Sequence, residues 1–223
     1  GLPNDQRVKV LTRAAQILEE KREELANLIV REIGFTKAEA DWEVDASIKI
    51  AHKLVEEGSK LDSTYMEGGK NENYLRREPL GTFVIITPWC SPLEVPVSKL
   101  FAALVAGNTV VFKPAREASV CGYYLVQALE NTGIPPGVIN LINGAGAEIG
   151  SYLISHHDVD GVSFTGCTNV GKLVAGSCST SFKKHELHLG DKSAVIVLED
   201  ADINHVVKST LIGSFRYAGQ RCN

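Results

Sequence analysis

The sequence predicts an α/β protein in which a parallel sheet is covered by helices on both faces. The first observation is a series of short β-rich runs in the middle of the chain, at residues 81–87, 109–113, 138–142 and 161–164. The second is a set of apolar stretches with helical spacing between those runs, at residues 95–105, 119–129 and 147–154. Short apolar strands that alternate with helices are typical of a parallel sheet buried on both faces.

Two helices are expected before the sheet. Residues 5–33 carry apolar positions at helical spacing, and Gly34 then provides a stop. A second helix is expected over about residues 36–57, ended by Gly58. Both helices are amphipathic and should pack one face against the rest of the protein. The polar stretch EGGKNEN, at residues 67–73, predicts a loop between this helical pair and the sheet.

The strand-helix pattern repeats once more towards the end of the chain. A strand is expected from Lys184, followed by the apolar run AVIVL at residues 194–198 and by a helix over about residues 202–217. Asp200 or Asp202 can cap that last helix, because a carboxylate at this position accepts from the free N–H groups of the first turn.

Composition excludes several classes of partner. The chain has 223 residues, 44% hydrophobic and 22% charged, with a formal charge of -4, so a broad nucleic-acid-binding surface is not expected. No apolar run approaches membrane-spanning length, so no membrane partner is expected. The five cysteines lack zinc-like spacing, which predicts no metal site and reduced thiols in the cytoplasm.

Two glycine-containing segments are candidates for phosphate binding. Gly144, Gly146 and Gly150 follow a strand, but their spacing is GxGxxxG rather than the dinucleotide fingerprint GxGxxG, so a tight strand-to-helix turn is favoured. In FTGCTNVG, Gly166 permits a turn and Thr168 can cap the following helix. A helix N-terminus offers free N–H groups that suit a pyrophosphate, although a structural turn has the same pattern.

Seven segments occur in the order and approximate spacing of a known family: ITPWCSPL, AGNTVVFKPA, GVINLINGAG, VSFTGCTNVG, LHLGDK, EDADIN and GQRCN. The chain resembles the coenzyme-binding half of an NAD(P)-dependent aldehyde dehydrogenase over essentially its whole length. The resemblance implies N-terminal helices and a Rossmann-like coenzyme domain at residues 1–187, and the beginning of a catalytic domain at residues 188–223. It also implies a longer protein that forms a homodimer or homotetramer, and a 223-residue fragment that is inactive alone.

The resemblance further implies the oxidation of an aldehyde to a carboxylic acid with NAD or NADP. Cys222, in GQRC, matches the nucleophile. Its thiolate would attack the aldehyde carbon to form a thiohemiacetal, hydride would leave for the nicotinamide, and water would hydrolyse the thioester. Cysteine suits this sequence of steps because a thiolate is both a strong nucleophile and a reasonable leaving group.

Several positions match residues that bind the coenzyme. By resemblance, Trp89 belongs to a turn near the coenzyme and Lys113 hydrogen-bonds the adenosine ribose. The remaining matched positions lie near the pyrophosphate, the adenine and the nicotinamide: Gly166, Cys167, Val170, Leu189 and Gly190.

The preference between the two coenzymes depends on the residues after Lys113. Arg116 stands where many relatives carry a glutamate that holds the ribose hydroxyls. A guanidinium there can bind a 2′-phosphate, which slightly favours NADP. Glu117 follows immediately and can take that place by a one-residue shift, so both coenzymes stay open.

Three departures from the family fall on its chemistry. Cys90 replaces an asparagine that donates to the developing oxyanion, and losing one such donor typically lowers the rate by about 10²–10³. His188 replaces the glutamate that serves as general base, a role open to histidine near neutral pH. Asp191 replaces a glycine and adds a side chain where the coenzyme should approach closely.

Glu186 shares a strand face with His188, at a distance of roughly 7 Å along the strand. It either orients the imidazole or is a solvent-facing charge, and the second interpretation is the simpler one. The substitutions leave an alternative function open, a catalytically degenerate relative with a structural or nucleotide-binding role. A third hypothesis, an acylating relative that transfers the acyl group to coenzyme A, is disfavoured by the segment LHLGDK.

Overall fold

The chain, described here by a computed structural model over residues 2–61, 64–68 and 71–221, is built on a parallel five-stranded sheet. The strand order is β5-β4-β3-β6-β7, and every neighbouring pair is parallel. The strands are β3 (Thr82–Ile86), β4 (Thr109–Lys113), β5 (Ile139–Leu141), β6 (Gly161–Gly166) and β7 (Lys184–Leu189). The predicted α/β fold and the predicted strands of its parallel sheet are therefore confirmed.

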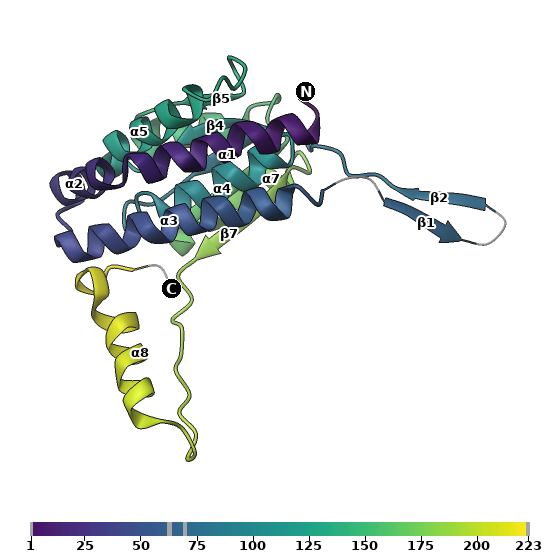
Figure 1. Cartoon of the computed structure of the whole chain (residues 1–223). Helices are drawn as coiled ribbons and strands as arrows, with labels where there is room; N and C mark the ends of the chain where they lie inside the picture. Colours follow the sequence, from purple (N-terminus) through teal and green to yellow (C-terminus); the bar gives the residue numbers. More distant parts are fainter. Residues whose placement is uncertain (1, 62–63, 69–70, 222–223) are drawn as a thin grey trace.

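Helices cover both faces of the sheet, as Figure 1 shows in part. Alternate side chains of β3 divide between two cores: Phe83 and Ile85 face α4 and α5, whereas Val84 and Ile86 face α6 and α7. The helices of the first face are α1 (Asn4–Glu20), α2 (Arg22–Ile33), α3 (Lys37–Gly58), α4 (Glu94–Val105) and α5 (Ser119–Glu130). Those of the second face are α6 (Ser151–Ser155) and α7 (Thr168–Ser179).

The N-terminal helices differ from the prediction in one respect. The helical run expected over residues 5–33 is two helices, because Lys21 leaves helical geometry (φ -97°, ψ 14°) between α1 and α2. Helix α3 begins where expected, since Thr36 and Glu39 form a reciprocal capping box. It ends at Gly58, whose lack of a side chain lets α4 approach: a Cβ there would lie 2.0 Å from Val105 Cγ2.

The prediction of a loop at residues 67–73 is wrong. Strands β1 (Thr64–Gly68) and β2 (Asn71–Leu75) pair antiparallel and form a hairpin that projects from the body (Figure 1). Polar residues are typical of loops, which is why the sequence predicted one here. A hairpin can still form from them, because strands pair through backbone hydrogen bonds, which do not require an apolar face. The helix expected over residues 147–154 is also divided, into a π-helical turn at Gly146–Gly150 and the short α6.

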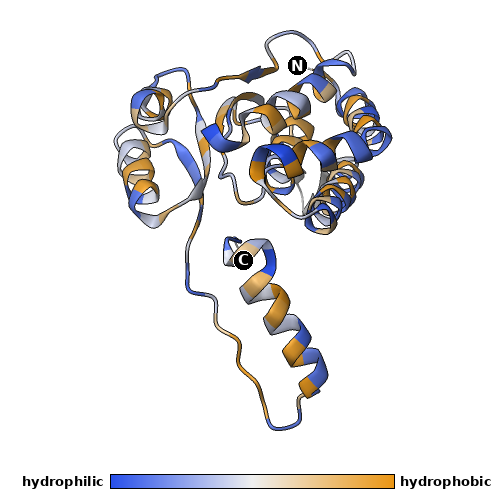
Figure 2. Ribbon diagram, turned by 90° about the vertical axis from the view of Figure 1, so that its left-hand side faces the viewer, coloured by the Kyte–Doolittle hydropathy of each residue, from blue (hydrophilic) through white to orange (hydrophobic). Residues whose placement is uncertain are grey.

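The chain leaves the sheet after β7 and extends away from the body (Figures 1 and 2). The apolar run at residues 194–198 forms neither helix nor strand and is exposed. Helix α8 (Ile203–Phe215) follows, capped by Asp202, which accepts from the backbone N–H of Asn204 at 2.9 Å. None of the residues of α8 is buried, and its exposed residues include large apolar ones such as Phe215. In Figure 2 the ribbon of α8 alternates between hydrophobic and hydrophilic segments.

The end of the described chain returns to the helical layer. A 3-10 turn (Arg216–Gly219) brings the ring of Tyr217 into a stack on Phe35, with ring centroids 4.2 Å apart. The Arg216 guanidinium lies 3.5 Å from the ring centroid of Trp42. Within the described ranges, no helix combines the length and apolar character that crossing a membrane requires.

Candidate active site

The carboxyl ends of the parallel strands gather most of the predicted coenzyme residues at one edge of the sheet. Lys113 ends β4, Gly166 ends β6 and Leu189 ends β7, while Trp89 lies in the turn just after β3. The chain builds β4 and β5 on one side of β3, and then β6 and β7 on the other. Such a reversal of strand order is a topological switch point, where open α/β sheets usually bind ligands.

The turn that carries Trp89 and Cys90 is held by a buried carboxylate from α3. Glu43 is fully buried and accepts from the hydroxyl of Ser91 at 3.1 Å and from the backbone N–H of Glu94 at 2.9 Å. It therefore caps α4 and fixes the backbone on which Cys90 stands. Cys90 is itself buried.

Lys113 and Arg116 lie in contrasting environments. Lys113 is 4% exposed, and its Nζ donates to the carbonyl of Pro114 at 3.2 Å. Burial lowers the pKa of Lys113, an effect that Glu117 partly offsets. The Arg116 side chain is 79% exposed and lies 3.8 Å from Glu117, so charges of both signs are present at the predicted ribose-binding position.

Helix α7 presents its N-terminus at the same edge. Its N-cap is Cys167, without a side-chain hydrogen bond to the first turn. The predicted cap, Thr168, is instead the first helical residue, and its hydroxyl donates to the carbonyl of Gly190 at 3.4 Å. Cys167 and Val170 are exposed there. Free N–H groups at this end of α7 suit an anionic group.

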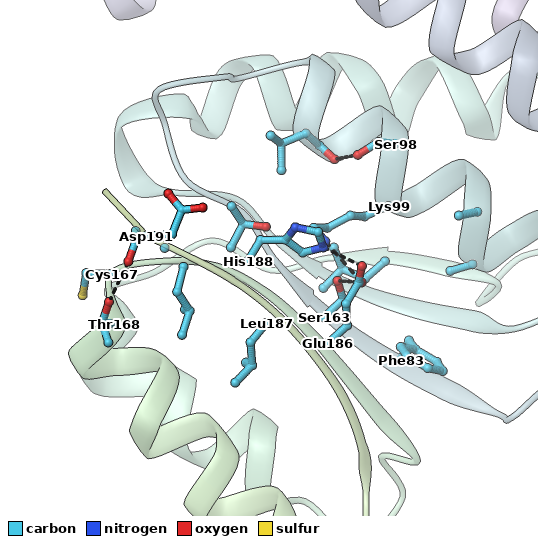
Figure 3. Close-up of a pocket in the computed structure, with 18 of the residues that line it drawn as sticks. Phe83, Ser98, Lys99, Ser163, Cys167, Thr168, Glu186, Leu187, His188 and Asp191 are labelled. Carbon is cyan, nitrogen blue, oxygen red and sulfur yellow. Dashed lines mark hydrogen bonds and ion pairs between the residues drawn. The ribbon is translucent and has the colours of Figure 1, made fainter. Parts of the chain in front are cut away.

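A cavity of about 1550 Å³ extends from this edge along the sheet face that also carries α4. Its walls come from both layers: Ser98 and Lys99 of α4, Ser163 and Thr165 of β6, and Glu186 and His188 of β7 (Figure 3). Cys167, Leu189 and Gly190 line the end of the cavity nearest the strand termini, and Arg221 also lies in its wall. Cys222, the predicted nucleophile, lies outside the described residues.

Inside the cavity, Glu186 joins three other polar groups. His188 Nε2 lies 2.6 Å from Glu186 Oε1. The hydroxyl of Ser163 donates to Oε2 at 2.7 Å, and Lys99 Nζ lies 3.2 Å from the same oxygen. Burial alone would raise the pKa of Glu186, but the bonds from His188 and Ser163 and the charge of Lys99 lower it to about 2.

These contacts combine features of both interpretations of Glu186. Its side chain is 56% exposed, as a solvent-facing charge would be, and its carboxylate is bonded to the imidazole of His188. The sequence did not identify Ser163 or Lys99 as partners. Strand pairing places Ser163 directly opposite Glu186, whereas Lys99 comes from a helix 87 residues earlier in the chain.

Asp191 lies in the wall of the same cavity, just beyond β7. Its Oδ1 accepts from the hydroxyl of Ser193 at 2.7 Å and from the backbone N–H of Ser193 at 3.1 Å. These bonds lower the pKa of Asp191, chiefly through the Ser193 side chain. A negative charge therefore stands close to the predicted nicotinamide positions.

The family model for the aldehyde dehydrogenase family matches residues 1–223. The chain is 36% identical over 223 residues to an alpha-ketoglutaric semialdehyde dehydrogenase of Bacillus subtilis (strain 168), a match that covers 99% of this chain and 46% of that protein. It is 35% identical to an NADP-dependent glyceraldehyde-3-phosphate dehydrogenase of Streptococcus equinus, with 97% of this chain and 47% of that protein covered. The chain thus spans about half the length of the curated relatives it matches.

Solved structures give the same picture. The NAD+ complex of an aldehyde dehydrogenase from Bacillus cereus superimposes with a TM-score of 0.93 at 33% identity, over 99% of this chain and 45% of that one. An NADP-dependent glyceraldehyde-3-phosphate dehydrogenase from Bacillus halodurans C-125, complexed with NADP, gives a TM-score of 0.91 at 35% identity, over 99% of this chain and 48% of that one. The sheet is accordingly Rossmann-like, and the chain belongs to the aldehyde dehydrogenase family.

Proposed function

We propose that the full-length protein oxidises an aldehyde to a carboxylic acid with NAD or NADP, with Cys222 as nucleophile and His188 as general base. The observation that carries this proposal is the cavity at the switch-point edge of the sheet. Its walls include His188 and Arg221, which immediately precedes Cys222 in the sequence, together with four of the predicted coenzyme positions: Gly166, Cys167, Leu189 and Gly190. This shared cavity supports a base at His188 next to the coenzyme.

The residues at this edge fit a dinucleotide. Lys113 offers an ammonium at the end of β4, and the open N-terminus of α7 offers N–H groups beside Gly166 and Cys167. Thr165 adds a hydroxyl in the cavity wall that has no hydrogen-bond partner among the described residues. We therefore assign the ribose to Lys113, the pyrophosphate to the Gly166–Cys167 turn and the adenine to Val170. Trp89, Leu189 and Gly190 would border the nicotinamide.

The protein's own groups would act in two stages. In the first, the Cys222 thiolate attacks the aldehyde carbon and forms a thiohemiacetal; Cys90 contributes little to stabilising the oxyanion, because a thiol is a poor donor. When bound, the coenzyme accepts the hydride. In the second, His188 takes a proton from water as the water oxygen attacks the thioester, and the C–S bond breaks to release the acid and the Cys222 thiolate.

We propose that the choice between NADP and NAD rests on Arg116 and Glu117. Arg116 is exposed and can meet a 2′-phosphate, while Glu117, 3.8 Å away, can accept from ribose hydroxyls. The exposed guanidinium slightly favours NADP, and the substrate of the full-length protein is an aldehyde.

Four further expectations belong to this proposal. Residues 188–223 would begin the catalytic domain, the full-length protein would be a homodimer or homotetramer, and the 223-residue chain alone would not turn over aldehyde. The expected inactivity rests on α8, which buries none of its residues in this chain, although Tyr217, just after α8, is anchored in the helical layer. None of the four described cysteines forms a disulfide, which fits the cytoplasm.

A single-turnover experiment on the full-length protein tests the function. Aldehyde and NADP or NAD are mixed with enzyme, and the rise in NAD(P)H absorbance is followed. The wild type and the control Cys178→Ala, a buried cysteine of α7, should give a burst, and Cys222→Ala should give none. Lys113→Ala should weaken coenzyme binding at least about tenfold in the same protein. A wild type without any burst would instead support the degenerate, non-catalytic alternative.

A further inference from the structure

In the cavity, three polar side chains contact one carboxylate, that of Glu186, and together restrain it. Lys99 and Ser163 both contact Oε2 of Glu186, and His188 contacts Oε1. The carboxylate is thereby held at both oxygens, from a helix on one side and from the neighbouring strand on the other. Figure 3 shows these side chains converging on Glu186 from separate elements.

Strand geometry explains why the imidazole reaches the carboxylate. Glu186 and His188 are two residues apart on β7, so their side chains leave the same face of the sheet. The register places Ser163 opposite Glu186 and Thr165 opposite His188, which lines up the two pairs on β6 and β7. Lys99 covers this face from α4, where only 8% of its side chain is exposed.

The protonation of the imidazole follows from these contacts. The pKa of Glu186 is about 2, so near neutral pH its carboxylate is ionised and only accepts hydrogen bonds. At 2.6 Å, His188 Nε2 must then carry the hydrogen of that bond. A neutral imidazole has one N–H, so its lone pair is on Nδ1. Nδ1 makes no hydrogen bond to any described residue, and Figure 3 shows it pointing away from Glu186.

We propose that Glu186 is a positioning residue that fixes His188 in the Nε2–H tautomer, so that Nδ1 is the atom that takes up a proton in the cavity. This assignment rests on the proposed function and names the atoms of its second stage. As the water oxygen forms its bond to the thioester carbon, one O–H bond breaks and that proton joins Nδ1. The C–S bond releases its electron pair to Cys222, and the ionised Glu186 stabilises the imidazolium until the proton passes to solvent.

A purely structural account explains less of the geometry. Lys99 is nearly buried and needs a counterion, which Glu186 supplies. That need does not account for His188, which makes the shortest contact to the carboxylate yet keeps 59% of its side chain exposed in the cavity. A group held at one ring nitrogen and open at the other has the geometry of a general base.

Nuclear magnetic resonance of this chain tests the tautomer without any substrate. The six histidines are labelled with ¹⁵N, and His188→Gln identifies the His188 signals. Long-range ¹H–¹⁵N correlation should show a proton on Nε2 and none on Nδ1, and the Nε2–H signal should exchange slowly with water. Glu186→Ala should abolish the slowly exchanging signal, whereas the exposed control Glu130→Ala should keep it. A proton on Nδ1, or a signal that persists in Glu186→Ala, would overturn the proposal.

Kinetics of the full-length protein separate positioning from folding. Glu186→Gln should lower kcat about 10–10²-fold with little change in KM, because it removes the ion that stabilises the imidazolium. In a His188→Glu background the base is a carboxylate, so the same Glu186→Gln change should leave kcat unchanged or raise it. An equal loss in both backgrounds would show a merely structural role and refute the assignment. Absence of all aldehyde oxidation would refute the proposed function instead, and the NMR result would still decide the tautomer.

Discussion

Replacing Glu43 by alanine should be among the most destabilising changes in the helical layer. The carboxylate is fully buried and accepts from four donors: the hydroxyls of Ser91 and Tyr217 and the backbone N–H groups of Leu93 and Glu94. A hydrogen bond to a charged acceptor contributes about 1.5–3 kcal/mol, and four of them give an upper range near 6–12 kcal/mol. Hydroxyl rotation and entry of water recover part of this, so we expect a loss of about 3–5 kcal/mol, as for other broken buried charge networks.

The assay is urea unfolding of this chain, followed by far-ultraviolet circular dichroism and by tryptophan fluorescence. Glu43→Gln keeps the shape and one acceptor oxygen, so it should lose about half as much as Glu43→Ala. Glu19→Ala is the control, because 65% of that side chain is exposed, and it should change stability by no more than about 0.5 kcal/mol. A loss below about 1 kcal/mol for Glu43→Ala would refute the idea that this carboxylate organises the turn before α4.

Three other changes test separate parts of the structure. Gly58→Ala should lower the free energy of unfolding by about 1–3 kcal/mol, since the new Cβ would lie 2.0 Å from Val105. Gly176→Ala is the matched control in α7, where a Cβ has open space, and it should raise the free energy of unfolding by about 0.5–1 kcal/mol. Urea unfolding of the two variants measures both changes. Arg116→Glu in the full-length protein should shift the ratio of kcat/KM from NADP towards NAD, and an unchanged ratio would discard the 2′-phosphate contact. The pKa of Glu186, about 2 against an ordinary 4.5, means that its stabilising contribution is full above about pH 4.5 and is lost as the pH falls towards 2. The difference in unfolding free energy between the wild type and Glu186→Gln should therefore shrink across that window, and a constant difference would contradict the pKa.

The sheet could be predicted from the sequence because its strands are short apolar runs buried on both faces. Both ends of the strand at residues 109–113 were predicted correctly, since an uninterrupted β-rich run begins at Thr109 and ends at Lys113. The hairpin at β1 and β2 was missed because its polar residues resemble a loop, and backbone pairing leaves no periodic apolar signal. The break at Lys21 was missed because helical spacing continues across it.

The site could be predicted only in part. The carboxyl ends of parallel strands lie at one edge of the sheet whatever their side chains are. The order of strands in the sequence was therefore enough to predict that residues such as Lys113 and Gly166 lie at that edge. The partners of Glu186 depend on packing between α4 and β7, which no local pattern encodes. Glu43 was overlooked for a similar reason: in the sequence it is one more acidic residue on an amphipathic helix, and only the fold reveals that it is buried.

An imidazole stands at position 188, where the resemblance implies a glutamate, and the carboxylate of Glu186 lies two residues away on the same strand face. A site freed from catalysis would be expected to lose such groups, because burying Lys99 and ionising Glu186 beside it gains little stability over apolar side chains of similar volume. Instead, the ammonium, the hydroxyl and the imidazole all contact the carboxylate of Glu186 beside an open cavity. Clusters with perturbed pKa values in a cleft are typical of working sites. We therefore propose that position 188 has exchanged a carboxylate base for a carboxylate-supported imidazole base rather than lost its base.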